Sequence, residues 1–192
     1  MEADMIRVYD DFFTNDENDF VFQYCLDASY YYGETDNDDT PVVGLVHDIF
    51  TFKDDERHIP ETMRFFGSMQ MREMEPKKFF NLFVDKIQEQ YPECTRDKLV
   101  RFYINMFSPH ENPYYHTDAE ESAKAITFLY YPQPDWTVQM NGETQFVVDG
   151  DLYGVAPVPN RLVSFAAEIP HRATAMRDNY RWTVAIKYED VT

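Results

Sequence analysis

Two histidines and one aspartate in the second half of the chain have the residue types that bind a catalytic metal ion. His116 and Asp118 are separated by one residue, and His171 follows after several predicted strands. Residues two apart on a strand point to the same face, so an extended segment at 116–118 would direct an imidazole and a carboxylate toward one ion. Two histidines and one carboxylate leave coordination positions open, as in non-haem Fe(II) oxygenases. A hydrogen-bonded histidine at a strand end is the alternative interpretation of His171.

A cation follows these residues at the start of the last predicted strand, 181–188. A turn over residues 177–180 would fold this strand back beside His171, with Arg181 and Thr183 pointing to the same side. A dicarboxylate co-substrate needs such an arrangement, because one end chelates the metal while the far carboxylate meets a bidentate guanidinium. The alternative is that Arg181 is a surface arginine on an edge strand. In that case the order of HxD, His171 and Arg181 along the chain would be a coincidence.

The first half of the chain contains the patterns of two helices. Residues 14–17 have the spacing of a capping box, and apolar residues follow at helical intervals. The second helix has Pro76 in its first turn and an apolar stripe over residues 79–87, and it ends at Pro92. We expect this stripe to cover one face of a sheet. The acidic segment 33–41 between the helices is predicted to be a loop, either a solvated connection or a lid over a peptide.

From residue 99 onward the sequence is typical of short strands. Runs rich in Val, Ile, Phe, Tyr and Thr alternate with turn residues at short intervals. Together with the preceding helices, they predict a mainly β fold, a β-sandwich braced by helices on one side. We therefore expect a single domain over 1–192, with a helix-rich support at 1–98 and the β core at 99–192.

Composition and charge limit the classes of partner. The chain has 192 residues, 44% of them hydrophobic, and a formal net charge of −18. Such a surface repels phosphate backbones and anionic membranes and would favour a basic protein or peptide as partner. The alternative is that the charge only keeps the protein soluble. The two cysteines, Cys25 and Cys94, fit no disulfide or zinc pattern. Without an apolar signal or a membrane-spanning run, the expected location is cytoplasmic.

The residues around the candidate ligands resemble the prolyl 4-hydroxylase-like branch of the 2-oxoglutarate/Fe(II)-dependent dioxygenases. The resemblance covers roughly residues 99–188 and depends on the order and separation of several short stretches. These stretches are Tyr114–Asp118, Phe128–Tyr131, Asp135-Trp136, Asn141–Thr144, Pro157–Val163, His171-Arg172 and Arg181.

The resemblance implies a fold, a reaction and a set of cofactors. The fold is a double-stranded β-helix (a jelly roll, cupin-like), with helices on its larger sheet. The reaction uses Fe(II), 2-oxoglutarate and O2, with succinate and CO2 as co-products, and ascorbate is the expected reductant. His116, Asp118 and His171 would be the metal ligands and the catalytic residues.

The resemblance also implies a co-substrate pocket. By position, Tyr131 is similar to the family tyrosine whose hydroxyl joins Arg181 at the far carboxylate of 2-oxoglutarate. Thr144 falls where the family lines this pocket, and Thr183 shares the side of Arg181. Strand alternation places Leu129 and Thr127 on the same inner face as Tyr131, whereas Phe128 and Tyr130 face the other way, onto the helices.

Four positions in this region stay open. The family commonly has two glycines before its Glu-Thr, and here the first is Asn141. On the strand before HxD, the family often has a tyrosine that contacts the co-substrate. In this chain the matching position is Asn105 or Phe107, and neither is a tyrosine. Tyr115 and Arg172 are candidates for the substrate entrance, although packing explains the tyrosine equally well.

The resemblance favours hydroxylation of a prolyl residue at C4 in a protein or peptide, with a basic sequence suited to the acidic surface. A free amino acid or another small molecule is the alternative substrate. A nucleobase demethylase is disfavoured by the net charge. An inactive β-sandwich binding module would be expected to have lost a ligand or the distal arginine, and a zinc hydrolase would leave Arg181 and Tyr131 without a purpose.

Overall fold

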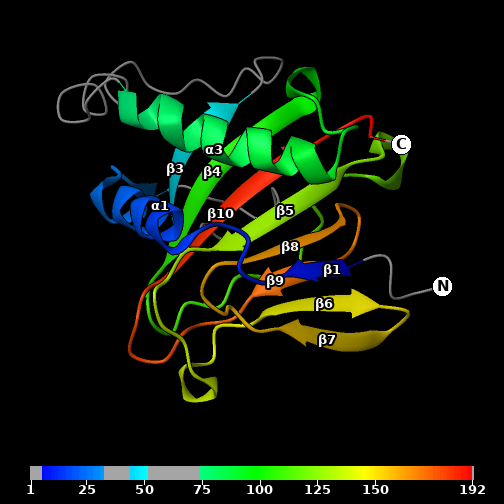
Figure 1. The fold of residues 1–192 in the computed structure, drawn as a ribbon. Coiled ribbons are helices and arrows are strands. Elements are labelled where there is room, and N and C mark those ends of the chain that lie inside the picture. Colours follow the sequence, from blue (N-terminus) through cyan, green and yellow to red (C-terminus); the bar gives the residue numbers. More distant parts are fainter. Residues whose placement is uncertain (1–5, 33–43, 52–73, 192) are drawn as a thin grey trace.

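The computed structural model describes residues 6–32, 44–51 and 74–191 (Figure 1). The predicted loop at 33–41 lies outside the described residues. The helices are α1 (Asn15–Asp27) and α3 (Met74–Gln90), and the strands are β1 (Ile6–Tyr9), β2 (Tyr31–Tyr32), β3 (Leu45–Thr51), β4 (Leu99–Phe107), β5 (Ile126–Tyr131), β6 (Thr144–Val148), β7 (Asp151–Val155), β8 (Arg161–Ala166), β9 (His171–Ala173) and β10 (Arg181–Tyr188). Three short 3-10 turns cover Arg96–Lys98, Glu121–Ala123 and Val138–Met140.

The strands form two antiparallel sheets. The large sheet has seven strands in the order β1-β8-β5-β10-β4-β3-β2, and the small sheet has three in the order β7-β6-β9. Both helices lie on one face of the large sheet, and the small sheet lies on the other side (Figure 1). The prediction of a mainly β fold with two facing sheets is confirmed.

The helix layer follows from the sequence patterns. Thr14 caps α1 with a complete capping box, and α3 carries Pro76 in its first turn. The stripe on α3 is fully buried at Phe79, Phe83 and Ile87 and packs against the large sheet. No helix in the described ranges is long and apolar enough to cross a membrane.

Strand alternation separates two cores, as predicted for β5. Phe128 and Tyr130 point to the helices, whereas Leu129 and Tyr131 point to the space between the sheets. Phe146 of the small sheet completes this second core. The inter-sheet space is therefore lined by alternate residues of each strand, and the candidate site lies there.

Two expectations about local structure were wrong. The HxD segment is not a strand: His116 makes a single antiparallel bridge to His171, and Asp118 lies in a bend. Strand β10 does not lie beside His171 in one sheet, because it pairs with β4 and β5 in the large sheet. His171 begins β9 of the small sheet, a three-residue strand that lacks the length for a recognisable strand pattern.

A buried asparagine before β8 fastens the N-terminal segment to the β core. Asn160 Oδ1 accepts hydrogen bonds from Phe13 N and the Tyr130 hydroxyl, both at 2.8 Å, and its Nδ2 donates to Phe13 O at 2.6 Å. The Asn160→Ala variant leaves the buried N–H and C=O of Phe13 without their Asn160 partner, so we expect its unfolding free energy to fall by about 2–4 kcal/mol. Urea unfolding would measure this loss. Asn112→Ala, which removes one exposed hydrogen bond, should cost less than about 1 kcal/mol, and an equal loss in both variants would contradict the assignment.

Candidate metal centre and co-substrate pocket

The structure brings His116, Asp118 and His171 together at one edge of the inter-sheet space. One ligand atom from each lies within 4.8 Å of the others. Asp118 Oδ1 is 3.8 Å from His116 Nε2, and Asp118 Oδ2 is 3.7 Å from His171 Nε2. Two donors bound to the same ion at about 2.1 Å each can be at most about 4.2 Å apart, so these separations suit a shared ion.

Backbone hydrogen bonds hold both imidazoles in the orientation that a metal ligand needs. His171 Nδ1 lies 2.9 Å from Ile169 O, and His116 Nδ1 lies 3.1 Å from Tyr114 O. A carbonyl only accepts, so each Nδ1 carries the proton and each Nε2 directs its lone pair toward Asp118. The two histidine backbones also bond to each other, with N···O distances of 3.0 and 2.9 Å. The donor set and its tautomers fit a divalent metal ion.

The Asp118 carboxylate is held ionised by its neighbours. Burial raises its pKa, but the positive charge that His171 and His116 carry when they are protonated, together with the hydrogen bond from Thr127, outweighs burial and leaves the pKa below its usual value. Thr127 Oγ1 donates to Asp118 Oδ2 at 2.6 Å from strand β5. The backbone N–H of Asp118 donates to Ala167 O at 2.8 Å, which anchors the bend.

The Thr127 hydroxyl therefore orients Asp118, a candidate metal ligand. We expect Thr127→Val to weaken metal affinity about 10- to 100-fold, since removing the partner of a ligating group has effects of this size. Titration with Fe(II) under anaerobic conditions would measure the affinity. Thr174→Val removes a hydroxyl that bonds to Glu143 O instead. Unchanged affinity in Thr127→Val, or the same loss in both variants, would show that Thr127 does not support the ligand.

Arg181 lies at the other end of the inter-sheet space. Its side chain is 2% exposed, and its Nε and one Nη donate at 2.8 Å to Gly142 O and Thr144 Oγ1. The other Nη is 3.4 Å from Thr183 Oγ1. The Tyr131 hydroxyl is 2.7 Å from Thr144 Oγ1. Arg181, Tyr131, Thr144 and Thr183 thus form one polar cluster, the residues that the family resemblance grouped around the co-substrate.

This cluster contains a buried cation without a carboxylate partner. Among the described residues, no Asp or Glu oxygen lies within 4.0 Å of the Arg181 guanidinium. Burial lowers its pKa, whereas Tyr131 and Glu143 act in the opposite direction. A buried charge without its counter-ion is costly, so the cluster suits an anion. Burial also raises the pKa of Tyr131, which keeps the phenol protonated as a hydrogen-bond donor.

The cluster and the metal ligands belong to one space. On strand β6, Thr144 pairs with Ala173 and Phe146 pairs with His171, so Thr144 is two residues from the position opposite a metal ligand. Leu129 lies on the inner face of β5 between Thr127 and Tyr131. A dicarboxylate that binds the metal at one end can therefore extend past Leu129 toward Arg181.

Both candidates on β4 point into this space. Asn105 pairs with Thr183, and Phe107 pairs with Arg181. Asn105 Oδ1 is buried and has no hydrogen-bond partner among the described residues, whereas the Phe107 ring packs against Gly44. Asn105 is the residue of the two that has polar capacity for a co-substrate.

Tyr115 and Arg172 lie together on the small sheet. Arg172 follows His171 on β9, so alternation turns it to the outer face of the small sheet. There it lies 4.5 Å from the Tyr115 ring centroid. Both residues also bond to Gln145 Oε1, at 3.0–3.1 Å. They form a polar cluster on the outer face of the small sheet and do not line the inter-sheet space, and their role at the substrate entrance stays a prediction.

Sequence reasoning missed three residues near Asp118. Thr127 was placed on the inner face of β5 but not next to the ligand. Arg101 and Lys187, on β4 and β10, line a cavity together with Asp118. The available signal was strand alternation, since Arg101 is four residues before Asn105 and Lys187 is six after Arg181. Charged residues at inward positions of two predicted strands are uncommon in a packed core.

Comparison of the sequence with protein-family models gave no match, and comparison with curated proteins gave none either. Solved structures do match. A prolyl hydroxylase from Trichoplax adhaerens, in complex with a hypoxia inducible factor peptide fragment, has a TM-score of 0.72 and 16% identity, covering 98% of this chain and 84% of that one.

Two further structures are similar over the same extent. An oxidoreductase of the 2OG-Fe(II) oxygenase family from Burkholderia pseudomallei has a TM-score of 0.69 and 14% identity, covering 98% of this chain and 86% of that one. The non-heme alpha ketoglutarate dependent epimerase SnoN from nogalamycin biosynthesis has a TM-score of 0.62 and 14% identity, covering 98% and 79%. The chain therefore has the fold of the prolyl 4-hydroxylase-like 2-oxoglutarate/Fe(II) oxygenases.

Proposed function

We propose that this protein is an Fe(II)- and 2-oxoglutarate-dependent dioxygenase that hydroxylates its substrate, with succinate and CO2 as co-products. The observation that carries the proposal is Arg181, a buried cation without a carboxylate partner among the described residues, in the same inter-sheet space as the His116, Asp118 and His171 ligand atoms. A dicarboxylate that chelates a metal satisfies both features at once.

Each part of the site has a task in this reaction. His116, Asp118 and His171 would hold the metal on one side and leave the other side open. Bound Fe(II) would supply the activation of dioxygen, coupled to oxidative decarboxylation of the co-substrate. Arg181, Tyr131 and Thr144 would bind and orient the far carboxylate.

The apolar residues around the ligands exclude water. Phe165 and Phe146 pack on the His171 ring, with centroids 4.6 and 5.9 Å away. Both rings are at most 1% exposed. An apolar wall of this kind would keep bulk water from the metal position and would strengthen the electrostatic interactions inside the site.

A prolyl residue in a protein or peptide, hydroxylated at C4, is the substrate that we propose. Support comes from the Trichoplax adhaerens protein, which is named as a prolyl hydroxylase and holds a peptide fragment. Similar folds also carry other reactions, as the epimerase illustrates, so the substrate needs its own test.

The test supplies the purified chain with Fe(II), 2-oxoglutarate, ascorbate and a panel of proline-containing peptides, some of them basic. We expect succinate to form and one peptide to gain the mass of one oxygen atom, located at C4 of proline by fragmentation and comparison with 4-hydroxyproline. Oxygen on another residue, or succinate without peptide modification, would refute the assignment of a prolyl substrate but would leave the assignment of a dioxygenase standing. Absence of succinate with peptides, free amino acids and other small molecules would contradict the dioxygenase.

A further inference from the structure

Strand β3 carries an acidic side chain on the face of the large sheet that lines the inter-sheet space. Asp48 is two residues from Val46 and opposite Tyr103 of β4, and both of these residues belong to the core between the sheets. The register shifts between Asp48 and Phe50, and irregularities of this kind are common next to active sites, where they redirect a side chain. Because acidic residues are rarely buried without a partner, an inward carboxylate at this position points to a specific contact.

The Asp48 carboxylate accepts one hydrogen bond and has capacity for more. The Tyr31 hydroxyl donates to Asp48 Oδ2, whereas Oδ1 is buried and has no hydrogen-bond partner among the described residues. No Lys, Arg or His nitrogen in the described part of the chain lies within 4.0 Å of this carboxylate. A buried oxygen without a donor is costly, and an ionised carboxylate only accepts. The position therefore suits a ligand that donates N–H groups.

The metal and the co-substrate do not account for Asp48. It lies outside the group of residues that could hold a metal ion. 2-Oxoglutarate is ionised at both ends and has no hydrogen-bond donor, so a further carboxylate would repel it. Asn105 has a second buried oxygen without a partner among the described residues, but its amide also carries donors and can serve either ligand. The group that Asp48 binds therefore belongs to the substrate.

A row of inward positions connects Asp48 with the metal ligands. On β3, β4, β10 and β5, the row consists of Asp48, Tyr103, Ala185 and Leu129. Leu129 is two residues from Thr127, which donates its hydroxyl hydrogen bond to Asp118. Three strand spacings of about 4.8 Å place Asp48 roughly 14 Å from Leu129. Asp48 is thus on the same floor as the metal ligands, at a distance from them.

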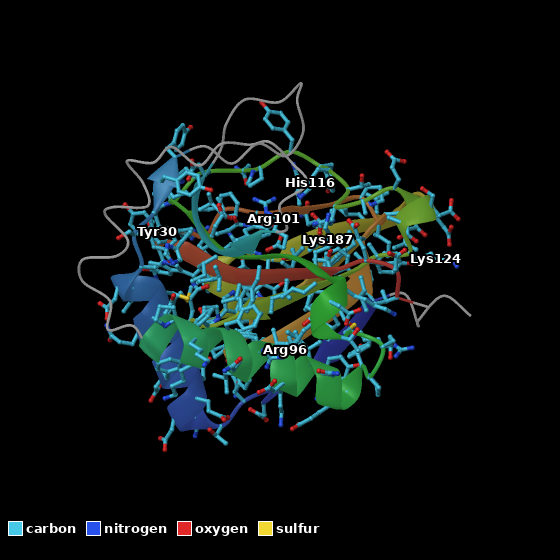
Figure 2. The ribbon with its side chains drawn as sticks, turned by 90° about the horizontal axis from the view of Figure 1, so that it is seen from above. Tyr30, Arg96, Arg101, His116, Lys124 and Lys187 are labelled. Carbon is cyan, nitrogen blue, oxygen red and sulfur yellow. The ribbon has the colours of Figure 1, made fainter. Side chains whose placement is uncertain are left out.

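The adjacent row shows which side of the large sheet this floor faces. It contains Thr127, Lys187 and Arg101. Figure 2 shows the labelled Arg101 and Lys187 in one region with His116, whereas Arg96 lies apart from them on the side of the helices. A cavity of about 40 Å³ beside Asp118 is lined by members of both rows, including Tyr103 and Ala185. The two rows therefore share the space that contains the metal ligands.

Resting on the proposed function, we infer that Asp48 binds a cationic N–H group of the substrate, an ammonium or a guanidinium, at a distance from the reacting carbon. A cation is favoured over a neutral donor because its hydrogen bond to a carboxylate is stronger, and because the net charge of −18 attracts cations. An extended chain advances about 3.3–3.6 Å per residue, so two residues and a long side chain cover roughly 14 Å. The span suits a lysine or arginine near the modified residue of a peptide and exceeds the length of a free amino acid.

Selection from a peptide library tests this inference without knowledge of the substrate sequence. The chain is loaded with Mn(II) and 2-oxoglutarate without oxygen and exposed to blocked heptapeptides with a central proline and random residues elsewhere. We expect lysine or arginine to be enriched at one position, whereas non-specific attraction by the acidic surface would enrich them at all positions alike. The selected peptide should bind at least about tenfold more tightly in calorimetry than the same peptide with glutamine in place of the basic residue.

The Asp48→Asn variant assigns the preference to the carboxylate. Asparagine keeps the shape of the side chain and an oxygen for the Tyr31 hydroxyl. We expect the preference to fall to less than about threefold, through weaker binding of the basic peptide, while 2-oxoglutarate affinity stays within about threefold of the wild type. The matched control is Asp19→Asn, which removes the same charge at an exposed position of α1, on the other side of the large sheet (Figure 1).

The outcomes separate the two sources of the cation and the two proposals. L-Prolinamide and N-acetyl-L-prolinamide are titrated in the same way, and an amine preference that Asp48→Asn abolishes would place the cation on a free amino acid instead of a peptide. No position-specific enrichment together with no amine preference, a preference that survives Asp48→Asn, or an equal loss in Asp19→Asn would overturn the subsite. Succinate formation is measured separately on the wild type. A cation preference without succinate would support the subsite and contradict the dioxygenase, and succinate without a preference would do the reverse.

Discussion

His171→Ala should lower the metal affinity of this chain by more than about 100-fold, because loss of a ligand exceeds the 10- to 100-fold effect of losing a ligand's hydrogen-bond partner. His171 supplies one of three ligand atoms, and its Nε2 lies 3.7 Å from the Asp118 carboxylate. Turnover of 2-oxoglutarate should then fall below detection. Anaerobic Fe(II) titration measures the affinity, and a succinate assay measures the turnover.

A second histidine provides the control for this variant. His110→Ala changes an exposed histidine in a loop that lies outside the ligand group, so metal affinity and turnover should stay near those of the wild type. His171 is buried, and the thermal midpoint of both variants must therefore be compared. A well-folded His171→Ala protein that binds Fe(II) like the wild type would show that the metal is held elsewhere.

Arg181→Gln should weaken 2-oxoglutarate binding about 100-fold or more while Fe(II) affinity stays within about threefold of the wild type. Truncating one partner of a buried charged pair costs about 2–5 kcal/mol, and the glutamine keeps a polar group near Thr144. Calorimetry of 2-oxoglutarate with the Mn(II)-loaded protein measures the effect. The 2-oxoglutarate affinity of Arg181→Lys should lie between those of the wild type and Arg181→Gln, because lysine keeps the charge but loses the bidentate geometry.

Arg96→Gln is the matched control for this charge. Arg96 forms an ion pair with Asp85 at 2.5 Å on the surface of the protein. Its substitution should leave 2-oxoglutarate affinity unchanged. Equal affinity in wild type and Arg181→Gln would mean that the buried arginine stabilises the fold only, and that the far carboxylate binds at another position.

Local patterns carried much of the fold prediction. The capping box at Thr14, the apolar stripe of α3 and the alternation on β5 each depend on neighbours within a few residues, and such patterns are legible in sequence. The grouping of Arg181 with Tyr131 came from the family resemblance, and the structure brings both to Thr144.

Long-range packing explains what sequence patterns did not predict. The bridge between His116 and His171 forms at the edge of the small sheet, and strand β9 has only three residues. Strand β10 belongs to the large sheet, whereas His171 lies in the small sheet. The register of β6 and β9 places Arg172 on the outer face of the small sheet. None of these pairings leaves a local signal, since register depends on contacts between distant segments.

Metal-dependent binding of 2-oxoglutarate tests the central claim most directly, because it requires no knowledge of the substrate. The wild-type chain is titrated with 2-oxoglutarate by calorimetry under anaerobic conditions, with and without Fe(II). We predict one 2-oxoglutarate per chain with Fe(II), and binding at least about tenfold weaker without it, since one end of the molecule then loses its chelating partner. No binding in the presence of Fe(II), or the same affinity with and without the metal, would contradict the assignment of this site to a 2-oxoglutarate-dependent dioxygenase.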